Sequence, residues 1–195
     1  MPIQFIRGVL KDPKNTGAVA PSSPFLAKEI LSHWPPSPKA TIVEYGPGTG
    51  AITKQLAKKL GADQSYLGLE MNPMFIKHLN KILPNLPMAN SSAEDIAIES
   101  EKRGLSKADL IVSGLPWANF NPSLQESILA ATAENLAEGG VFSTFAYVHA
   151  LPLPRARQFA GRLRKAFKEV NVSQVIWRNL PPAVIYHCSQ EKLGK

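Results

Sequence analysis

Residues 41–50 read TIVEYGPGTG, and this stretch decides the fold. A short apolar run ends in Glu44, and glycines follow at alternate positions, Gly46, Gly48 and Gly50. Residues 51–60, AITKQLAKKL, then place apolar side chains at helical spacing. A strand, a glycine turn and a helix in this order let the backbone pass close to a ligand at the helix N-terminus. We therefore expect a ligand-binding turn at the end of the first strand.

A second apolar run, residues 66–69, ends in Glu70, with Met71 beside it. A carboxylate at the end of the second strand can accept hydrogen bonds from both hydroxyls of a ribose. The glycine turn and Glu70 together predict a nucleoside ligand. A tight strand-to-helix turn that binds nothing is the alternative.

Three nucleotide loops compete for this turn. A phosphate-binding P-loop needs Gly-Lys-Ser/Thr, whereas Ala51 and Ile52 follow Gly50, so it is excluded. The dinucleotide pattern Gly-x-Gly-x-x-Gly is weakened, because Ala51 occupies its last position. The S-adenosylmethionine loop of class I methyltransferases, Glu/Asp-x-Gly-x-Gly-x-Gly, matches at every position from Glu44. An acid ahead of the glycines suits the cationic end of that cofactor and would repel a pyrophosphate.

Composition places limits on the class of protein. The chain has 195 residues with 44% hydrophobic residues, which is typical of one soluble globular domain. No apolar run approaches the roughly 18 to 20 residues that cross a bilayer, and the N-terminus shows no signal-peptide pattern. The lone cysteine, Cys188, fits a reducing cytoplasm. No metal-ligand set is assigned.

The net charge of +7 is concentrated at the two ends of the chain. Residues 151–195 hold nine Lys/Arg against two acids, and residues 1–40 hold five against two. Basic ends around an acidic centre suggest a polyanionic partner, either nucleic acid or an anionic membrane. A merely solvated surface is the alternative.

We divide the chain into N-terminal helices, residues 1–34, and a main domain, residues 35–195. Residues 1–14 form a short basic amphipathic pattern, which suits either a helix in a membrane interface or an ordinary capping helix. A second helix is predicted after Ser23 as its N-cap and Pro24 at its first position. Its inward-facing residues are expected to be Phe25, Leu26, Ile30 and Leu31.

Strands and helices alternate from residue 41 onward, which predicts an α/β fold with a doubly wound, mostly parallel sheet. The last two strands are separated by few residues and must form an antiparallel hairpin. The arrangement is that of the Rossmann-like class I methyltransferases. The predicted strands are 41–45, 66–70, 87–90, 109–113, 141–150, 170–177 and 183–188, and the predicted helices are 50–60, 73–82, 94–103, 122–137 and 155–168.

Ligands of an open α/β sheet bind beyond the carboxyl ends of the strands. The third strand is followed by NSSAEDI, residues 90–96. Ser92, Ala93 and Glu94 are the candidate contacts to an adenine at this position. Asp95 is a further possibility, and Glu94 can alternatively be an ordinary first-turn acid of a helix.

The fourth strand is followed by SGLPWANF, residues 113–120, where amino methyltransferases carry Asn-Pro-Pro-Tyr or Asn-Leu-Pro-Tyr. Methyl transfer needs an uncharged nitrogen held in line with the sulfonium methyl. Backbone carbonyls at Gly114 and Leu115 are candidate acceptors for the amine, and Ser113 is assigned to the same site. Trp117 is predicted to face the cationic product, with core packing as its alternative. Because position 113 lacks Asp or Asn, a nucleic-acid base amine lacks its usual side-chain acceptor.

The whole chain resembles the bacterial phospholipid N-methyltransferases, which convert phosphatidylethanolamine stepwise toward phosphatidylcholine. The resemblance rests on Glu70 and on FIRGVLKDPKNTGAVAPSSPFLA, VEYGPGTG, VSGLPWANF and VIWRNLPPAVIY. It implies that the N-terminal helix is a membrane anchor. The rRNA adenine dimethyltransferases are related, but they usually have Asn at position 113 and an extra helical domain.

The resemblance also implies roles for residues near the cofactor. Arg178 is expected to pair with the lipid phosphate, with Asn179 beside it. Tyr147 is the candidate for orienting the amine, and His149 is a weaker candidate for the same task. Packing or solvation remains open for each.

Two serines and one basic helix complete the predicted contacts. Ser22 and Ser23 are expected near the carboxylate end of the cofactor. The helix 155–168 is expected to bury Phe159, Leu163 and Phe167 and to offer its basic side chains to anionic lipid.

The predicted activity is therefore an S-adenosylmethionine-dependent N-methyltransferase that acts on an amino-phospholipid at the cytoplasmic face of the membrane. Its cofactor is S-adenosyl-L-methionine, and nucleic acid is disfavoured as a partner. An rRNA adenine N6-methyltransferase and a non-catalytic, cofactor-binding peripheral membrane protein are the alternatives. The number of methyl groups added, the head group and the oligomeric state are left open.

Overall fold

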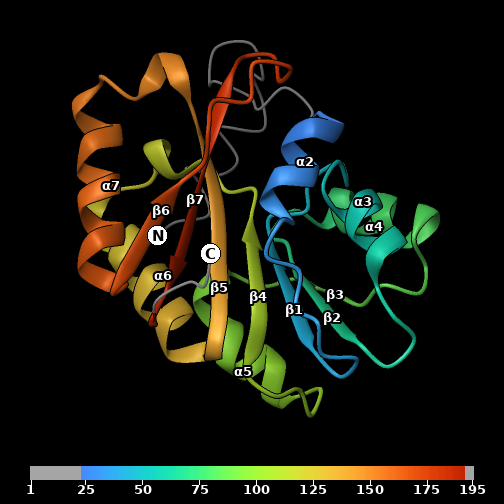
Figure 1. The fold of residues 1–195 in the computed structure, drawn as a ribbon. Helices are drawn as coiled ribbons and strands as arrows, with labels where there is room; N and C mark the ends of the chain where they lie inside the picture. Colours follow the sequence, from blue (N-terminus) through green and yellow to red (C-terminus); the bar gives the residue numbers. More distant parts are fainter. Residues whose placement is uncertain (1–22, 192–195) are drawn as a thin grey trace.

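The computed structural model describes residues 23–191, which form one seven-stranded sheet flanked by helices (Figure 1). The strand order across the sheet is β3-β2-β1-β4-β5-β7-β6. The strands are β1 Thr41–Tyr45, β2 Ser65–Leu69, β3 Met88–Ala89, β4 Ala108–Ser113, β5 Leu136–Tyr147, β6 Glu169–Val172 and β7 Ala183–Ser189.

Strands β1 to β5 run parallel, and β7 lies antiparallel between β5 and β6. The carboxyl ends of β1, β4 and β5 therefore meet at one edge, together with the first residues of β7. Tyr147 at the end of β5 pairs with Ala183 at the start of β7. The connection from β6 to β7, residues 173–182, projects from this same edge, which we call the carboxyl edge.

Helices cover both faces of the sheet. The helices are α2 Pro24–Ile30, α3 Thr53–Lys59, α4 Pro73–Ile82, α5 Ile96–Glu101, α6 Pro122–Asn135 and α7 Pro154–Ala166, with short 3₁₀ turns at Ala93–Asp95, Trp117–Asn119 and Val148–Ala150. One core joins the sheet to α5, α6 and α7, and a second joins it to α2 and α3. The central strands β1 and β4 are buried on both faces, as expected for a parallel sheet.

Several helices begin with a polar cap followed by proline, as the sequence predicts for α2. The side chains of Ser23, Asn72 and Asn121 accept hydrogen bonds from backbone N–H groups of α2, α4 and α6. These bonds satisfy N–H groups that have no partner within the helix. The cap at Asn72 fixes the start of α4 directly after Glu70.

The structure corrects three details of the sequence prediction. Phe25 does not face inward: 39% of its surface is exposed, while Leu26 and Ile30 of the same helix are fully buried. The long fifth strand begins at Leu136 and ends at Tyr147, so His149 lies in a 3₁₀ turn. The sixth strand ends at Val172, five residues early. Among residues 23–191, no helix combines the length and apolarity needed to cross a bilayer.

Candidate active site

The glycine turn after β1 is built on backbone conformations that favour glycine. Gly46, Gly48 and Gly50 have φ values of 64°, 56° and 82°. A Cβ placed on Gly50 would lie 2.7 Å from Leu79, so a side chain there would collide with α4. Among the residues that the structure describes, a Cβ on Gly48 would meet only the Gly46 oxygen, at 3.8 Å. The backbone at Gly48 therefore faces open space, where a ligand can approach it closely.

Glu70 lies beside this turn at the end of β2. Its carboxylate accepts hydrogen bonds from the N–H of Gly48 at 3.0 Å and the N–H of Asn72 at 2.8 Å. Burial raises the pKa of Glu70, and the backbone N–H groups of Asn72, Gly48 and Met71 act in the opposite direction. A carboxylate has about four lone-pair positions, so Glu70 keeps acceptor capacity for a ribose hydroxyl. The residues present thus fit the predicted nucleoside cofactor.

Asn90, at the end of β3, was missed as a site residue by the sequence prediction. Its side-chain amide donates to the carbonyls of Glu70 and Met71, at 3.0 Å in both cases. Asn90 therefore fixes the backbone that carries Glu70 and the partly exposed Met71. An asparagine directly after a short strand was the available signal.

Glu44 has a different position from the one expected. Only 1% of its surface is exposed, and its two oxygens accept bonds from Thr53 at 3.1 Å and Tyr66 at 2.7 Å. Burial raises the pKa of Glu44 to about 7, although both hydrogen bonds lower it. The carboxylate does not line the open surface at Gly48. We correct its role to one of tying β1 to β2 and α3 beneath the turn.

The loop after β4 lies directly against the glycine turn. The N–H of Gly114 donates to the carbonyl of Tyr45 at 2.8 Å. A Cβ on Gly114 would lie 2.9 Å from the Gly46 oxygen, and a Cβ on Gly46 would lie 2.9 Å from the Leu115 side chain. The structure therefore brings the predicted amine acceptors, Gly114 and Leu115, next to the predicted cofactor loop.

Ser113 and Trp117 support this loop from inside the core, which corrects their predicted contacts with cofactor and product. Ser113 is fully buried and Trp117 is 3% exposed. The indole N–H donates to the hydroxyls of Ser113 at 3.1 Å and Thr144 at 3.0 Å, and the ring stacks on Phe159. With its ring packed and its N–H satisfied, Trp117 cannot face a cationic product in this structure.

The segment after β3 carries the three candidate adenine contacts, Ser92, Ala93 and Glu94. The Asp95 side chain accepts bonds from the Ser91 hydroxyl at 2.8 Å and the Ser92 N–H at 3.3 Å. Asp95 is therefore engaged in capping its own helical turn. Ser92 and Glu94 belong to the same cap, since the Ser92 hydroxyl donates to the Glu94 carboxylate at 3.3 Å and accepts from the Glu94 N–H at 3.3 Å. Both are partly exposed beside the buried Ala93, and the adenine contact of this segment stays a prediction.

Tyr147 and His149 lie together where β5 ends. Their rings stack with centroids 5.7 Å apart and an angle of 12° between the planes. Burial raises the pKa of Tyr147, so its hydroxyl is neutral at physiological pH. The pair lies at the carboxyl edge, as predicted, and its contact with an amine stays a prediction.

Asn179 is a structural residue rather than an exposed substrate contact. It is 3% exposed, its side-chain oxygen accepts from the Ser23 N–H at 3.0 Å, and its side-chain N–H donates to the Pro181 carbonyl at 2.6 Å. Arg178 is exposed and places its guanidinium 3.9 Å from the ring centroid of Phe25. Ser22 and the predicted N-terminal anchor lie outside the described residues.

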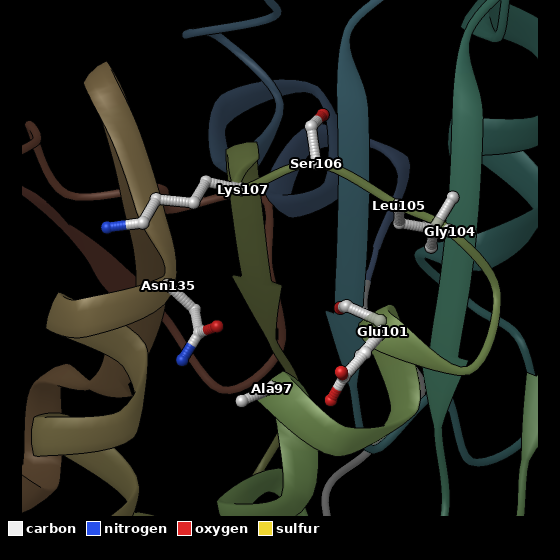
Figure 2. Close-up of a pocket in the computed structure, with 8 residues that line it drawn as sticks. Ala97, Glu101, Gly104, Leu105, Ser106, Lys107 and Asn135 are labelled. Carbon is white, nitrogen blue, oxygen red and sulfur yellow. The ribbon is translucent and has the colours of Figure 1, made fainter.

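A pocket of about 400 Å³ lies at the opposite edge of the sheet and does not belong to this site. Figure 2 shows Lys107, Asn135 and Glu101 around it. Lys107 and Asn135 directly precede β4 and β5, so the pocket lies at the amino ends of these strands. Ligands of such sheets bind at the carboxyl ends, where Glu70 and the glycine turn lie.

Comparison with known proteins agrees with this geometry. Residues 22–93 match the family described as ribosomal RNA adenine dimethylase. A TehB-like S-adenosylmethionine-dependent methyltransferase from Corynebacterium glutamicum has a similar fold, with a TM-score of 0.62 at 14% identity over 98% of this chain and 100% of the other. Aeropyrum pernix fibrillarin, solved with natively bound S-adenosyl-L-methionine, gives a TM-score of 0.59 at 14% identity over 76% and 66%.

One relative is similar in sequence over nearly its full length. It is the ornithine lipid N-methyltransferase of Singulisphaera acidiphila, 31% identical over 187 residues, which cover 94% of this chain and 93% of the relative. Together with the glycine turn, Glu70 and the seven-stranded sheet, this similarity identifies the chain as an S-adenosylmethionine-dependent class I methyltransferase that belongs to the same family as that enzyme.

Proposed function

We propose that the protein transfers methyl groups to the amine of an amino-phospholipid, converting phosphatidylethanolamine toward phosphatidylcholine, at the cytoplasmic face of the membrane. The observation that carries the lipid class is the end-to-end similarity to an ornithine lipid N-methyltransferase. The carboxyl edge supports the amine chemistry, because Gly114 and Leu115 lie against the glycine turn there.

In this proposal Glu70 and the backbone at Gly48 hold the nucleoside part of the cofactor. The bound cofactor supplies an electrophilic methyl group on a sulfonium. The backbone of Gly114 and Leu115 accepts an N–H of the amine, which aligns the nitrogen lone pair. The Leu115 carbonyl already accepts the Trp117 N–H at 3.0 Å, and its second lone pair is available to an amine.

Tyr147 is proposed to orient the amine from the end of β5. Because burial raises its pKa, its phenol is a hydrogen-bond partner at neutral pH rather than a strong base. The amine nitrogen must reach the site without its extra proton, and the Tyr147 oxygen can accept an N–H of the neutral form. His149, stacked on the ring, helps to fix its orientation.

Ornithine lipid is a second candidate substrate, because the relative that covers 94% of this chain is named for it. An rRNA substrate is supported only by the match to residues 22–93, which covers β1 to β3 and therefore the cofactor half of the fold. Ser113 is buried and bonded to Trp117, so it offers no acceptor to a base amine. We therefore favour a lipid over RNA.

Membrane binding through residues 1–14 and the basic C-terminal region is part of the proposal. In the structure Phe159 and Leu163 of α7 are buried, while Arg162 of the same helix is engaged with Glu126 at 3.2 Å. Of the basic residues on α7, exposed Arg155 and Arg157 are therefore better placed than Arg162 to contact lipid.

The test is to incubate the pure full-length protein and methyl-labelled cofactor with separate acceptors: phosphatidylethanolamine vesicles, ornithine lipid vesicles and rRNA. Phosphatidylcholine vesicles, which lack a free amine, control for carry-over of label. We expect label in phosphatidylethanolamine. Label only in ornithine lipid would assign the activity to the ornithine head group instead. Label only in rRNA would overturn the lipid assignment. Cofactor binding without any transfer would indicate a non-catalytic protein.

A further inference from the structure

Two large apolar side chains at the carboxyl edge are almost fully exposed. Trp177 and Leu180, in the connection between β6 and β7, have 73% and 83% of their surface exposed. Figure 1 shows this red connection projecting beyond the sheet beside α2. Single exposed apolar residues are common, but here a tryptophan and a leucine lie on either side of exposed Arg178.

The backbone that carries these side chains is held firmly. Asn179, between them, is buried and donates its N–H to the Ile176 carbonyl at 3.1 Å, while its side chain bonds to Ser23 and Pro181. We call residues 176–181 the insertion turn. Because its backbone is already ordered, burying its apolar side chains in a partner costs little additional chain entropy.

The surface around the insertion turn is positively charged. Arg178 lies within it, and Arg155 and Arg157 lie in the first turn of α7, which also starts at the carboxyl edge. Residues 148–157 and 173–182 contain no Asp or Glu. None of the ion pairs between residues 23 and 191 uses these three arginines. Arginines at a helix N-terminus oppose the helix dipole, so this placement favours an anionic partner.

We propose that the insertion turn places Trp177 and Leu180 in the interfacial layer of an anionic bilayer, with Arg178 at the lipid phosphates. Tryptophan and arginine suit the boundary between head groups and acyl chains, where one end of the side chain is apolar and the other polar. A second copy of the chain fits less well, since a symmetric contact would bring two sets of arginines together.

This inference rests on the proposed lipid substrate and adds the side of the protein from which the lipid reaches the site. The insertion turn and Tyr147 lie at the same edge, because Ile176 bridges to Ala183, the strand partner of Tyr147. A turn that enters the bilayer here makes the open side of the site face the lipid surface. A lipid amine then reaches the site while its acyl chains remain in the bilayer.

The direct test is fluorescence quenching by lipids brominated on their acyl chains, in vesicles containing phosphatidylglycerol. The chain has three tryptophans, Trp34, Trp117 and Trp177. We expect the bromine atoms to quench the wild-type emission, the Trp177→Phe variant to lose that quenching, and the Trp34→Phe variant to keep it. Equal quenching in the wild type and Trp177→Phe would show that Trp177 remains outside the bilayer and would overturn the proposal.

Vesicle partitioning of the full-length protein gives a second readout. The double variant Trp177→Ser, Leu180→Ser should partition roughly tenfold or more weakly, while Ile98→Ser, which changes a half-exposed residue of α5, should partition like the wild type. Residues 1–22 are identical in all variants, so the difference reports the turn. Equal partitioning, or self-association that depends on Trp177 without vesicles, would contradict bilayer insertion. Insertion without methylation of lipid would reject the proposed substrate alone.

Discussion

The carboxylate of Glu70 accepts a hydrogen bond of 3.0 Å from the backbone N–H of Gly48, which joins the end of β2 to the glycine turn after β1. The two residues are 22 positions apart in the chain. Their contact positions one acid beside the open backbone of one glycine, and in the proposed site the cofactor lies against both. Changing either Glu70 or Gly48 should therefore weaken cofactor binding more than it weakens substrate binding.

Replacing Glu70 by Gln should weaken S-adenosylmethionine binding by roughly tenfold to a hundredfold. Hydrogen bonds to a charged group contribute about 1.5 to 3 kcal/mol each, and glutamine is neutral and has only one acceptor oxygen. Titration calorimetry measures the change. Glu101→Gln, at the pocket on the opposite edge, is the matched control and should bind normally. Unchanged affinity of the Glu70 variant would refute the ribose assignment.

Replacing Gly114 by Ala should displace the glycine turn. The added Cβ would lie 2.9 Å from the Gly46 carbonyl oxygen, which is backbone and cannot move freely. We expect a loss of about 1 to 3 kcal/mol in the free energy of unfolding and a matching loss of cofactor affinity. Gly161→Ala provides the comparison, because its added Cβ in α7 has no described neighbour within 4 Å other than the adjacent helix backbone. Denaturant unfolding should show that this control is as stable as the wild type or more so.

Trp117→Phe should lower stability rather than product affinity. Phenylalanine keeps an aromatic ring against Phe159 but removes the N–H that both Ser113 and Thr144 accept. Leaving buried hydroxyls without this donor costs about 1 to 3 kcal/mol, measured by urea unfolding. Exposed Trp177→Phe should change the free energy of unfolding by less than about 0.5 kcal/mol. An unaltered unfolding midpoint for Trp117→Phe would restore the product-binding hypothesis.

Tyr147→Phe should lower kcat about tenfold or more while leaving cofactor affinity unchanged. The phenylalanine ring still stacks on His149 and keeps its edge contact with Phe145, but the hydroxyl proposed to orient the amine is lost. Initial rates at saturating cofactor and calorimetry separate the two effects. A kcat equal to that of the wild type would reduce Tyr147 to a packing residue.

His187 should make the folded state sensitive to acid. Burial, with His33 beside it, lowers the pKa of His187 to about 4 from an ordinary value of 6.5. Its ring faces Ser143, Ser32 and, at 4.0 Å, Glu29. Between pH 6.5 and 4 the unfolded chain binds this proton and the folded chain does not. The free energy of unfolding is therefore highest above pH 6.5, where His187 is neutral in both states, and it decreases as the pH falls toward 4.

Between pH 7 and pH 5 this effect amounts to about 2 kcal/mol in the free energy of unfolding. Glu44 acts with the opposite sign, because its raised pKa of about 7 costs stability as the pH rises from 4.5. The measurement is therefore a difference between wild type and His187→Gln in urea unfolding at the two pH values. A difference that does not change with pH would contradict the lowered pKa.

The sequence by itself determined the order of strands and helices along the chain. It also determined the glycine turn after β1 and the position of Glu70 at the end of β2. These features depend on local patterns: apolar periodicity, glycines at alternate positions, and caps such as Ser23 followed by Pro24. The antiparallel hairpin also followed from a short connection. Features that depend on neighbouring residues could thus be predicted from the amino-acid sequence alone.

Only the tertiary structure decided that several polar and aromatic side chains of the motifs are buried. Glu44, Ser113 and Trp117 occur in motif positions that suggest ligand contact, yet each is enclosed by partners distant in sequence, such as Tyr66 and Thr144. Asn179 is likewise bonded to Ser23, 156 residues away. A sequence pattern gives the period of a strand or helix, but burial depends on what packs above it. Trp177 and Leu180 are exposed because no described element packs over the turn that carries them, and the sequence pattern does not show this.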